Sequence, residues 1–326
     1  MPLSCLTFAV SVVALAACSS ASSTPGAADA GDASVPPEET GGPGADGSVI
    51  SDAGVSPETS ADASAFASRP YKAIVPKDYD VTKPIPLVLS LHGFSVDAEL
   101  QERYLKFKEL ADAKTFLVAE PDGTKDEDGN RFWNASPACC NFYGNDVDDV
   151  AYLTWVIDDM ASKYAVDPKR VFVFGHSNGG FMAHRLACER SSKIAAIVSL
   201  AGAAPSPPVT CTPDTKVAVL QVHGTADDTI AYDGGVALVG FPAHPGAKES
   251  VAFWAAKNGC DGALVETGTK IDITQQPGSE TTVARHACPN GGGAELWSID
   301  KGTHIPVFAP GWNDALWEFY IAHPKP

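Results

Sequence analysis

The sequence predicts an α/β fold, a doubly wound and mostly parallel sheet with helices on both faces. Apolar runs of strand length alternate along the chain with segments of helical periodicity. One run, residues 86–93, is apolar almost throughout, as expected for a strand buried on both faces of a parallel sheet. Another, residues 170–175, passes through a glycine-rich turn directly into a helical segment. We find no internal repeat.

Apolar spacing defines the elements of the first half. Leu100, Tyr104, Phe107 and Leu110 recur at helical intervals and predict one amphipathic helix. A long polar loop is expected from Pro121 to Asn145. The elements before that loop are a short edge strand at 73–76, a strand at 86–93, the helix and a strand at 115–120.

The second half repeats the alternation. A helix is predicted from Val150 to Tyr164 by its apolar spacing, with Asp146 or Asp148 placed to cap its start. The remaining predicted elements are strands at 170–175, 194–200, 217–222 and 295–299 and helices at 179–189, 248–257 and 312–321.

The 326 residues divide into three parts. Residues 1–17 contain an apolar run that is typical of a signal peptide and too short to span a membrane. The run ends at Leu15-Ala16-Ala17-Cys18, which resembles a bacterial lipobox in which Cys18 is lipidated; an ordinary secretory signal is the alternative. Residues 18–68 are predicted to be a disordered acidic tether. Residues 69–326 contain no second linker and are read as one domain.

Composition excludes several classes of protein. The chain is 44% hydrophobic and 19% charged, which is globular. Its net charge of −17 argues against nucleic acid as a partner, because phosphate backbones require a basic surface. Eight cysteines are too few for a small disulfide scaffold but more than a protein of the reducing cytosol usually has.

The strongest motif is Gly175-His176-Ser177-Asn178-Gly179, which lies between an apolar strand and a helix. A serine on such a tight strand-to-helix turn presents its Oγ at the edge of the sheet, and glycines avoid collisions with neighbouring backbone. We therefore predict Ser177 as a nucleophile. The alternative is an ordinary serine in a glycine-rich turn.

A nucleophilic serine requires a base and an orienting carboxylate, which in this arrangement follow in the order acid, then histidine. A buried strand ends at 217–222 and leads to Asp227 and Asp228, either of which could serve. We favour Asp227 because the turn resembles the His-Gly-x-x-Asp pattern of hydrolases that use a serine nucleophile. A solvated loop aspartate is the alternative for both.

His304 is the predicted base, because it lies in a glycine-marked turn just after the strand at 295–299. The other downstream histidines are less suitably placed: His244 in a Pro/Gly loop, His286 in an extended segment and His323 near the last helix. His184, on the helix after Ser177, is expected to be structural.

Two backbone N–H groups are expected to bind the oxyanion, those of Asn178 and Phe94. Trp133, in the long polar loop, and His92, at the end of a strand, are candidate substrate-binding residues. Structural packing is the alternative for both.

Taken together, these residues resemble the secreted esterase family of the α/β-hydrolase superfamily, which includes polyhydroxybutyrate-depolymerase-like proteins and feruloyl and acetyl-xylan esterases. At Ile305-Pro306 the sequence departs from the aromatic residue that many members carry before this proline. The blocks that carry the resemblance are residues 86–93, 121–124, 133–135 with Cys139-Cys140, 147–150, 166–170, 177–180 with 185–188, and 223–227.

Six cysteines remain in the predicted domain and allow fifteen pairings. Their positions in the predicted topology favour three bonds, Cys188–Cys211, Cys260–Cys288 and the adjacent pair Cys139–Cys140. The spacing of cysteines and histidines does not suggest a metal site.

The resemblance implies a serine carboxylic-ester hydrolase that acts on polymer-linked or polymer-derived esters, either polyhydroxyalkanoates or plant-wall feruloyl and acetyl esters. It implies no cofactor. We expect a monomer in the bacterial cell envelope, attached to a membrane only through lipid on Cys18, or else a secreted protein. The alternative function is a non-catalytic surface lipoprotein that uses the hydrolase fold for binding.

Overall fold

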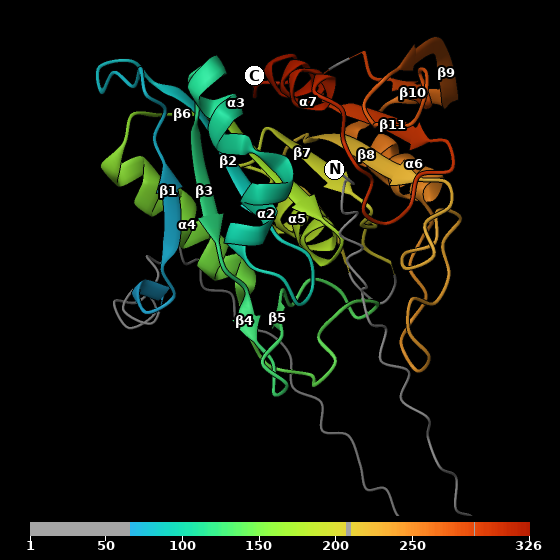
Figure 1. Cartoon of the computed structure of the whole chain (residues 1–326), viewed down its shortest axis with the longest axis horizontal. Coiled ribbons are helices and arrows are strands. Elements are labelled where there is room, and N and C mark those ends of the chain that lie inside the picture. Colours follow the sequence, from blue (N-terminus) through green and yellow to red (C-terminus); the bar gives the residue numbers. More distant parts are fainter. Residues whose placement is uncertain (1–65, 207–209, 290) are drawn as a thin grey trace, which may run out of the picture. The chain divides into compact units, whose positions relative to one another are not determined.

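The computed structural model describes residues 66–206, 210–289 and 291–326. Figure 1 shows a central sheet with helices on either side. The strands are β1 (Tyr71–Ile74), β2 (Ile85–Leu91), β3 (Leu117–Pro121), β4 (Thr124–Lys125), β5 (Arg131–Phe132), β6 (Val166–His176), β7 (Ala196–Leu200), β8 (Ala218–Gly224), β9 (Asp261–Ile271), β10 (Thr281–Ala287) and β11 (Gly293–Ile299). The helices are α2 (Ala98–Leu105), α3 (Phe107–Lys114), α4 (Asp149–Lys163), α5 (Asn178–Glu189), α6 (Ala247–Asn258) and α7 (Gly311–Ile321).

The main sheet has the strand order β1-β3-β2-β6-β7-β8-β11-β10-β9. Strands β3, β2, β6, β7, β8 and β11 are parallel to one another, whereas β1, β10 and β9 join antiparallel at the edges. The predicted doubly wound, mostly parallel sheet is confirmed. In this arrangement the carboxyl ends of β6, β8 and β11 lie at one edge of the sheet, where open α/β sheets bind ligands.

Strand β2 shows how the sheet separates two cores. Alternate residues of a strand point to opposite faces, so Leu87 and Leu89 pack with α4, α5 and α6, whereas Val88 packs with α3 and α7. All seven residues of β2 are buried, which explains its continuous apolar sequence. Helix α4 is capped by Asp148, one of the two predicted caps. The Asp148 carboxylate accepts a hydrogen bond from the backbone N–H of Ala151.

The structure differs from the predicted elements in three places. The single helix over residues 100–110 is two helices, because Lys106 adopts the left-handed conformation and ends α2. Strands β9 and β10 are additions at the sheet edge, and β9 is almost entirely exposed. The loop from Pro121 contains the β4–β5 hairpin rather than irregular chain alone.

The folded domain begins slightly before residue 69. The ring of Phe66 lies 5.9 Å from that of Tyr152 and packs on the core, although we predicted this residue within the tether. The predicted signal peptide, Cys18 and most of the tether lie outside the described residues. Among the described residues, no helix is both long and apolar enough to cross a membrane.

Candidate active site

Ser177 lies on the turn between β6 and α5, in a backbone conformation of φ 55° and ψ −121° that side-chain-bearing residues rarely adopt. The turn is possible because its glycines permit very close backbone contacts. A Cβ on Gly175 would lie 2.0 Å from the carbonyl oxygen of Gly179, and a Cβ on Gly179 would lie 2.2 Å from that of Leu91. Steric contacts at the Ser177 turn therefore explain why glycines occupy positions 175 and 179.

The structure brings together the three predicted residues at the carboxyl edge of the sheet. The Nε2 atom of His304 lies 2.9 Å from Ser177 Oγ, and its Nδ1 atom lies 2.9 Å from Asp227 Oδ2. The side chain of Asp227 is fully buried. Asp228 is exposed and accepts a hydrogen bond from the Thr229 hydroxyl. The geometry thus selects Asp227 of the two aspartates.

Asp227 is held as an anion. Its burial favours the neutral acid, but hydrogen bonds from His223 and His304 outweigh this and move the pKa of the carboxyl well below its usual range. Its other oxygen, Oδ1, accepts hydrogen bonds from the backbone N–H groups of Thr229 and Ile230, both at 2.9 Å. The carboxylate is therefore fixed in position and ready to orient the His304 imidazole.

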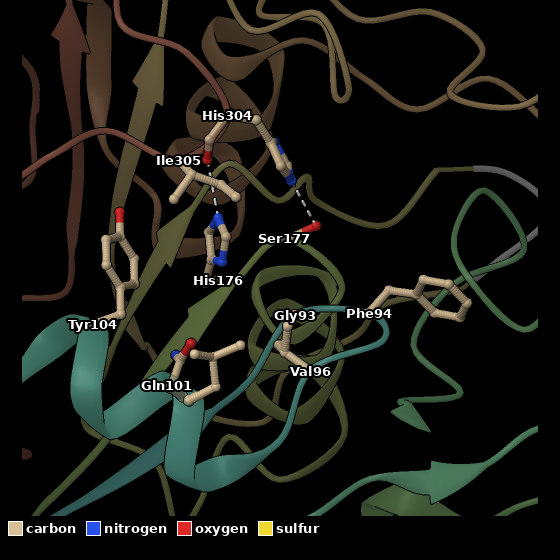
Figure 2. A pocket seen from close by; sticks show the side chains of 10 residues that line it. Gly93, Phe94, Val96, Gln101, Tyr104, His176, Ser177, His304 and Ile305 are labelled. Carbon is tan, nitrogen blue, oxygen red and sulfur yellow. Dashed lines mark hydrogen bonds between the residues drawn. The ribbon is translucent and has the colours of Figure 1, made fainter. Parts of the chain in front are cut away.

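The loop that carries His304 is attached to the rest of the site through backbone carbonyls. The Nε2–H group of His176 donates to the carbonyl of His304 over 3.0 Å, and the Tyr104 hydroxyl donates to the carbonyl of Pro306 over 2.7 Å. Burial lowers the pKa of His176 to about 4, so its imidazole is neutral at pH 7. Figure 2 shows the His176 and His304 rings and the dashed contacts that link them to their neighbours.

A cavity of about 340 Å³ opens beside Ser177. In Figure 2, Gln101 and Tyr104 come from α2, and Phe94 comes from the loop after β2. Most of the lining is apolar. The residues that line the cavity are Gly93, Phe94, Val96, Leu100, Gln101, Tyr104, His176, Ser177, His304 and Ile305.

Trp133 and His92 were candidate substrate-binding residues, and the structure gives both the packing contacts that were the alternative. Both side chains are fully buried outside the cavity lining. The Trp133 indole donates to the carbonyl of His92 over 2.9 Å, and His92 accepts from the backbone N–H of Gly123 over 2.8 Å. Burial lowers the pKa of His92 to about 4. The two residues support the loop that leads to Phe94.

The two predicted oxyanion donors belong to residues close to Ser177. Phe94 lines the cavity, and Asn178 is the first residue of α5, where backbone N–H groups lack acceptors within the helix. The Asn178 side chain is engaged elsewhere: it accepts from the backbone N–H of Trp133 and donates to the Trp133 carbonyl. This pairing attaches the long loop directly to the nucleophile turn.

The other histidines lie outside the triad. Each of His244, His286 and His323 has a ring nitrogen hydrogen-bonded to a nearby backbone carbonyl. The three predicted disulfides, Cys188–Cys211, Cys260–Cys288 and Cys139–Cys140, are present. Among the described residues, no group of three or more His, Cys, Asp or Glu side chains is arranged to hold a metal ion.

Sequence reasoning missed most of the cavity wall. Leu100 and Tyr104 appeared only as the apolar face of a helix, and Val96 and Gln101 gave no functional signal. Ile305 was noted only as the departure from the aromatic residue of the resembling family. Phe241 was also missed; its ring lies 5.3 Å from that of Phe142, which in turn contacts Phe94 at 4.9 Å. These three aromatic rings therefore come from three separate segments of the chain.

Comparison with known proteins agrees with this fold. Residues 147–242 match the family model described as Phospholipase/Carboxylesterase. Feruloyl esterase B of Piromyces equi is 29% identical over 250 residues, which cover 75% of this chain and 43% of that protein. A protein of Aspergillus flavus named "Probable feruloyl esterase C" is 28% identical over 265 residues, which cover 78% of this chain and 84% of that protein.

Among solved structures, an acetyl xylan esterase from Aspergillus awamori matches with a TM-score of 0.53 and 16% sequence identity, covering 77% of this chain and 93% of that one. At this identity the likeness concerns the fold. The chain spans less than half the length of each of the first three curated relatives that it matches. The matched parts cover 42%, 43% and 20% of those three proteins.

The parallel sheet, the strained serine turn and the hydrogen-bonded Ser177, His304 and Asp227 define an α/β-hydrolase. The family model and these relatives support an α/β-hydrolase esterase family for this chain.

Proposed function

We propose that the protein is an extracytoplasmic serine carboxylic-ester hydrolase. The continuous hydrogen-bonded series from Ser177 Oγ through His304 to Asp227, beside an apolar cavity, carries this proposal. Its relatives include proteins named as feruloyl esterases.

In the acylation step, Ser177 Oγ attacks the ester carbonyl carbon while His304 Nε2 accepts the hydroxyl proton. Asp227 accepts the Nδ1–H bond, which holds Nε2 toward the serine and stabilises the positive imidazolium. The oxyanion receives hydrogen bonds from the backbone N–H groups of Asn178 and Phe94. His304 then donates its proton to the leaving alcohol.

Deacylation repeats the same proton transfers with water. His304 Nε2 accepts a proton from a water molecule, whose oxygen attacks the acyl carbonyl carbon. Collapse of the second oxyanion breaks the bond to Ser177 Oγ, and the proton returns from His304 to the serine. The product is a carboxylic acid, and all the groups needed belong to this chain.

The cavity suits an uncharged, largely apolar part of the substrate. Its polar side chains are already engaged, since the Gln101 amide donates to the Leu91 carbonyl and Tyr104 donates to Pro306. Leu100 and Ile305 line the cavity and remain 44% and 59% exposed. Esters that are linked to or derived from polymers, either polyhydroxyalkanoates or plant-wall feruloyl and acetyl esters, are the proposed substrate class, and the relatives named as feruloyl esterases support it.

The decisive experiment combines Ser177→Ala with a fluorophosphonate label and a substrate panel. The wild-type protein should be labelled on Ser177 and should hydrolyse at least one of acetyl, feruloyl and polyester probes. Ser177→Ala should lose labelling and activity while it keeps its melting temperature. A folded wild-type protein that neither reacts nor hydrolyses any probe would instead favour the binding-only lipoprotein.

The location forms part of the same proposal. Three disulfides are consistent with an oxidising compartment, and the lipobox-like Cys18 supports attachment to the cell envelope, with secretion as the alternative.

A further inference from the structure

Four buried polar side chains extend from α6 through the core to Asp227. The Trp254 indole N–H donates to His184 Nδ1 over 2.8 Å, and His184 Nε2 lies 3.1 Å from Gln221 Oε1. Gln221 Nε2 lies 3.1 Å from His223 Nδ1, and His223 Nε2 lies 3.3 Å from Asp227 Oδ2. The four side chains are at most 1% exposed, and the mechanism above uses none of them.

The direction of every hydrogen bond can be assigned from the Trp254 end. An indole N–H can only donate, so His184 Nδ1 must be the accepting nitrogen. In a neutral imidazole the proton then lies on Nε2, which donates to Gln221 Oε1. Burial lowers the pKa of His184 to about 4, which agrees with a neutral ring.

Two carbonyl groups assign the other end independently. The Gly202 carbonyl can only accept, and it lies 2.9 Å from Gln221 Nε2, which is therefore the amide NH₂ group. That group also faces His223 Nδ1, which must accept. The Ile230 carbonyl lies 2.8 Å from His223 Nε2, which must donate. Assignments from both ends agree at Gln221.

The assignment fixes which face His223 presents to the catalytic carboxylate. Its Nε2–H group points at both the Ile230 carbonyl and Asp227 Oδ2, the oxygen that also accepts from His304. In the other neutral tautomer a lone pair on Nε2 would face these two acceptors. Repulsion in a buried site would then displace the Asp227 turn.

We propose that Gln221 and His223 are positioning residues for Asp227: the Gln221 amide holds His223 in its Nε2–H tautomer, and that N–H holds the carboxylate and the Ile230 carbonyl in place. The proposal deepens the proposed esterase function and rests on it. Trp254 and His184 orient the Gln221 amide from the far side of the core.

The first test does not require activity. Nitrogen-15 NMR of histidine-labelled protein distinguishes the two neutral tautomers and the cation of each ring. His223 and His184 should both be neutral Nε2–H tautomers at pH 7. A His223 that carries its proton on Nδ1, or that is a cation, would overturn the proposal even if the enzyme is fully active.

The second test uses a matched pair at His223. His223→Gln places an amide N–H near the position of Nε2, whereas His223→Leu removes the donor. His223→Leu should lower kcat by up to about a hundredfold, the loss that a misplacement of a catalytic group by about 1 Å can cause. KM should change little, because the cavity is lined by other elements. His223→Gln should recover most of the lost kcat.

The control is His286→Leu, the same substitution at a half-buried histidine on β10 that belongs neither to the triad nor to this network, and it should leave kcat unchanged. If His223→Leu does not fold, Gln221→Met removes the amide that sets the tautomer, together with its bonds to Gly202 and His184, and leaves His223 itself in place. The NMR spectrum of this variant should then show His223 partly in the Nδ1–H form, with a lower kcat. Unchanged kcat in a folded His223→Leu or Gln221→Met would refute the positioning role. An inactive wild type with the expected tautomers would instead refute the esterase function.

Discussion

Asp227 and Asp228 are neighbours in sequence, yet their environments separate their roles. The Asp227 side chain is buried and bonded to His304, whereas Asp228 is exposed. Asp227→Asn should lower kcat by about 10⁴-fold because the amide disturbs the His304 tautomer, and Asp228→Asn should change kcat less than about twofold. Steady-state kinetics on one soluble ester would compare the two variants. Similar losses in both would contradict the assignment.

At the residue scale, the sequence identified the three candidate catalytic side chains because a motif, a strand end and a glycine-marked turn each have local signals. It could not show where Trp133 and His92 point. An aromatic residue in a polar loop has the same sequence signature whether it contacts substrate or packs on the sheet. Only the hydrogen bond from the indole of Trp133 to the His92 carbonyl separates the two cases.

The loop between β3 and α4 depends on Trp133 as a packing element. Trp133→Ala should remove about 3–5 kcal/mol from the free energy of unfolding, because a fully buried indole leaves a cavity. Thermal unfolding would measure the loss. The exposed Tyr143 of the same loop provides the control, since Tyr143→Ala should shift the melting temperature far less.

The same variant separates packing from substrate contact. If Trp133 only supports the loop, kcat/KM should fall by a similar factor for a small acetyl ester and for a bulky aryl ester. A loss confined to the bulky ester, with an unchanged melting temperature, would restore the role predicted from the sequence.

Element boundaries were predictable where burial produces a regular pattern. The parallel strands and the helices α4, α5, α6 and α7 have such patterns. The break at Lys106 depends on one left-handed backbone conformation. A lysine in the sequence does not indicate this conformation. Strand β9 has almost no buried side chains, so its sequence lacks the alternation by which strands are recognised.

At the scale of the whole molecule, buried neutral histidines make stability depend on pH. His92, His176 and His184 have pKa values of about 4 in the folded state, against about 6.5 in an unfolded chain. Between these values the unfolded chain binds more protons than the folded one, so stability falls as the pH falls. The slope contributed by the three is at most about 4 kcal/mol per pH unit.

The expected result is a melting temperature that is nearly constant above pH 7 and decreases between about pH 6.5 and 4. Differential scanning calorimetry across this range would measure it. A melting temperature that stays constant down to pH 4.5 would show that these rings are protonated in the folded protein or are exposed to solvent.

A second prediction for the whole molecule concerns its cellular location. Cys18→Ser should move the protein from the membrane fraction to the soluble fraction, because two or more acyl chains hold a protein firmly whereas one holds it only marginally. Cell fractionation with immunoblotting measures this shift, with Ser177→Ala as the variant that should remain in the membrane fraction. Wild-type protein found wholly in the medium would refute lipidation and favour plain secretion.

The hydrogen bond between Ser177 and His304 joins residues that are 127 positions apart in the sequence. Ser177 comes at the end of β6, and His304 follows β11, with β7 and β8 between them in the sheet. Contacts of such long range form slowly, because loop closure must precede them. During refolding, esterase activity should therefore return only after the strands from β6 to β11 have paired, later than the recovery of helical signal. The rate at which esterase activity returns would then measure the rate of the last stage of folding.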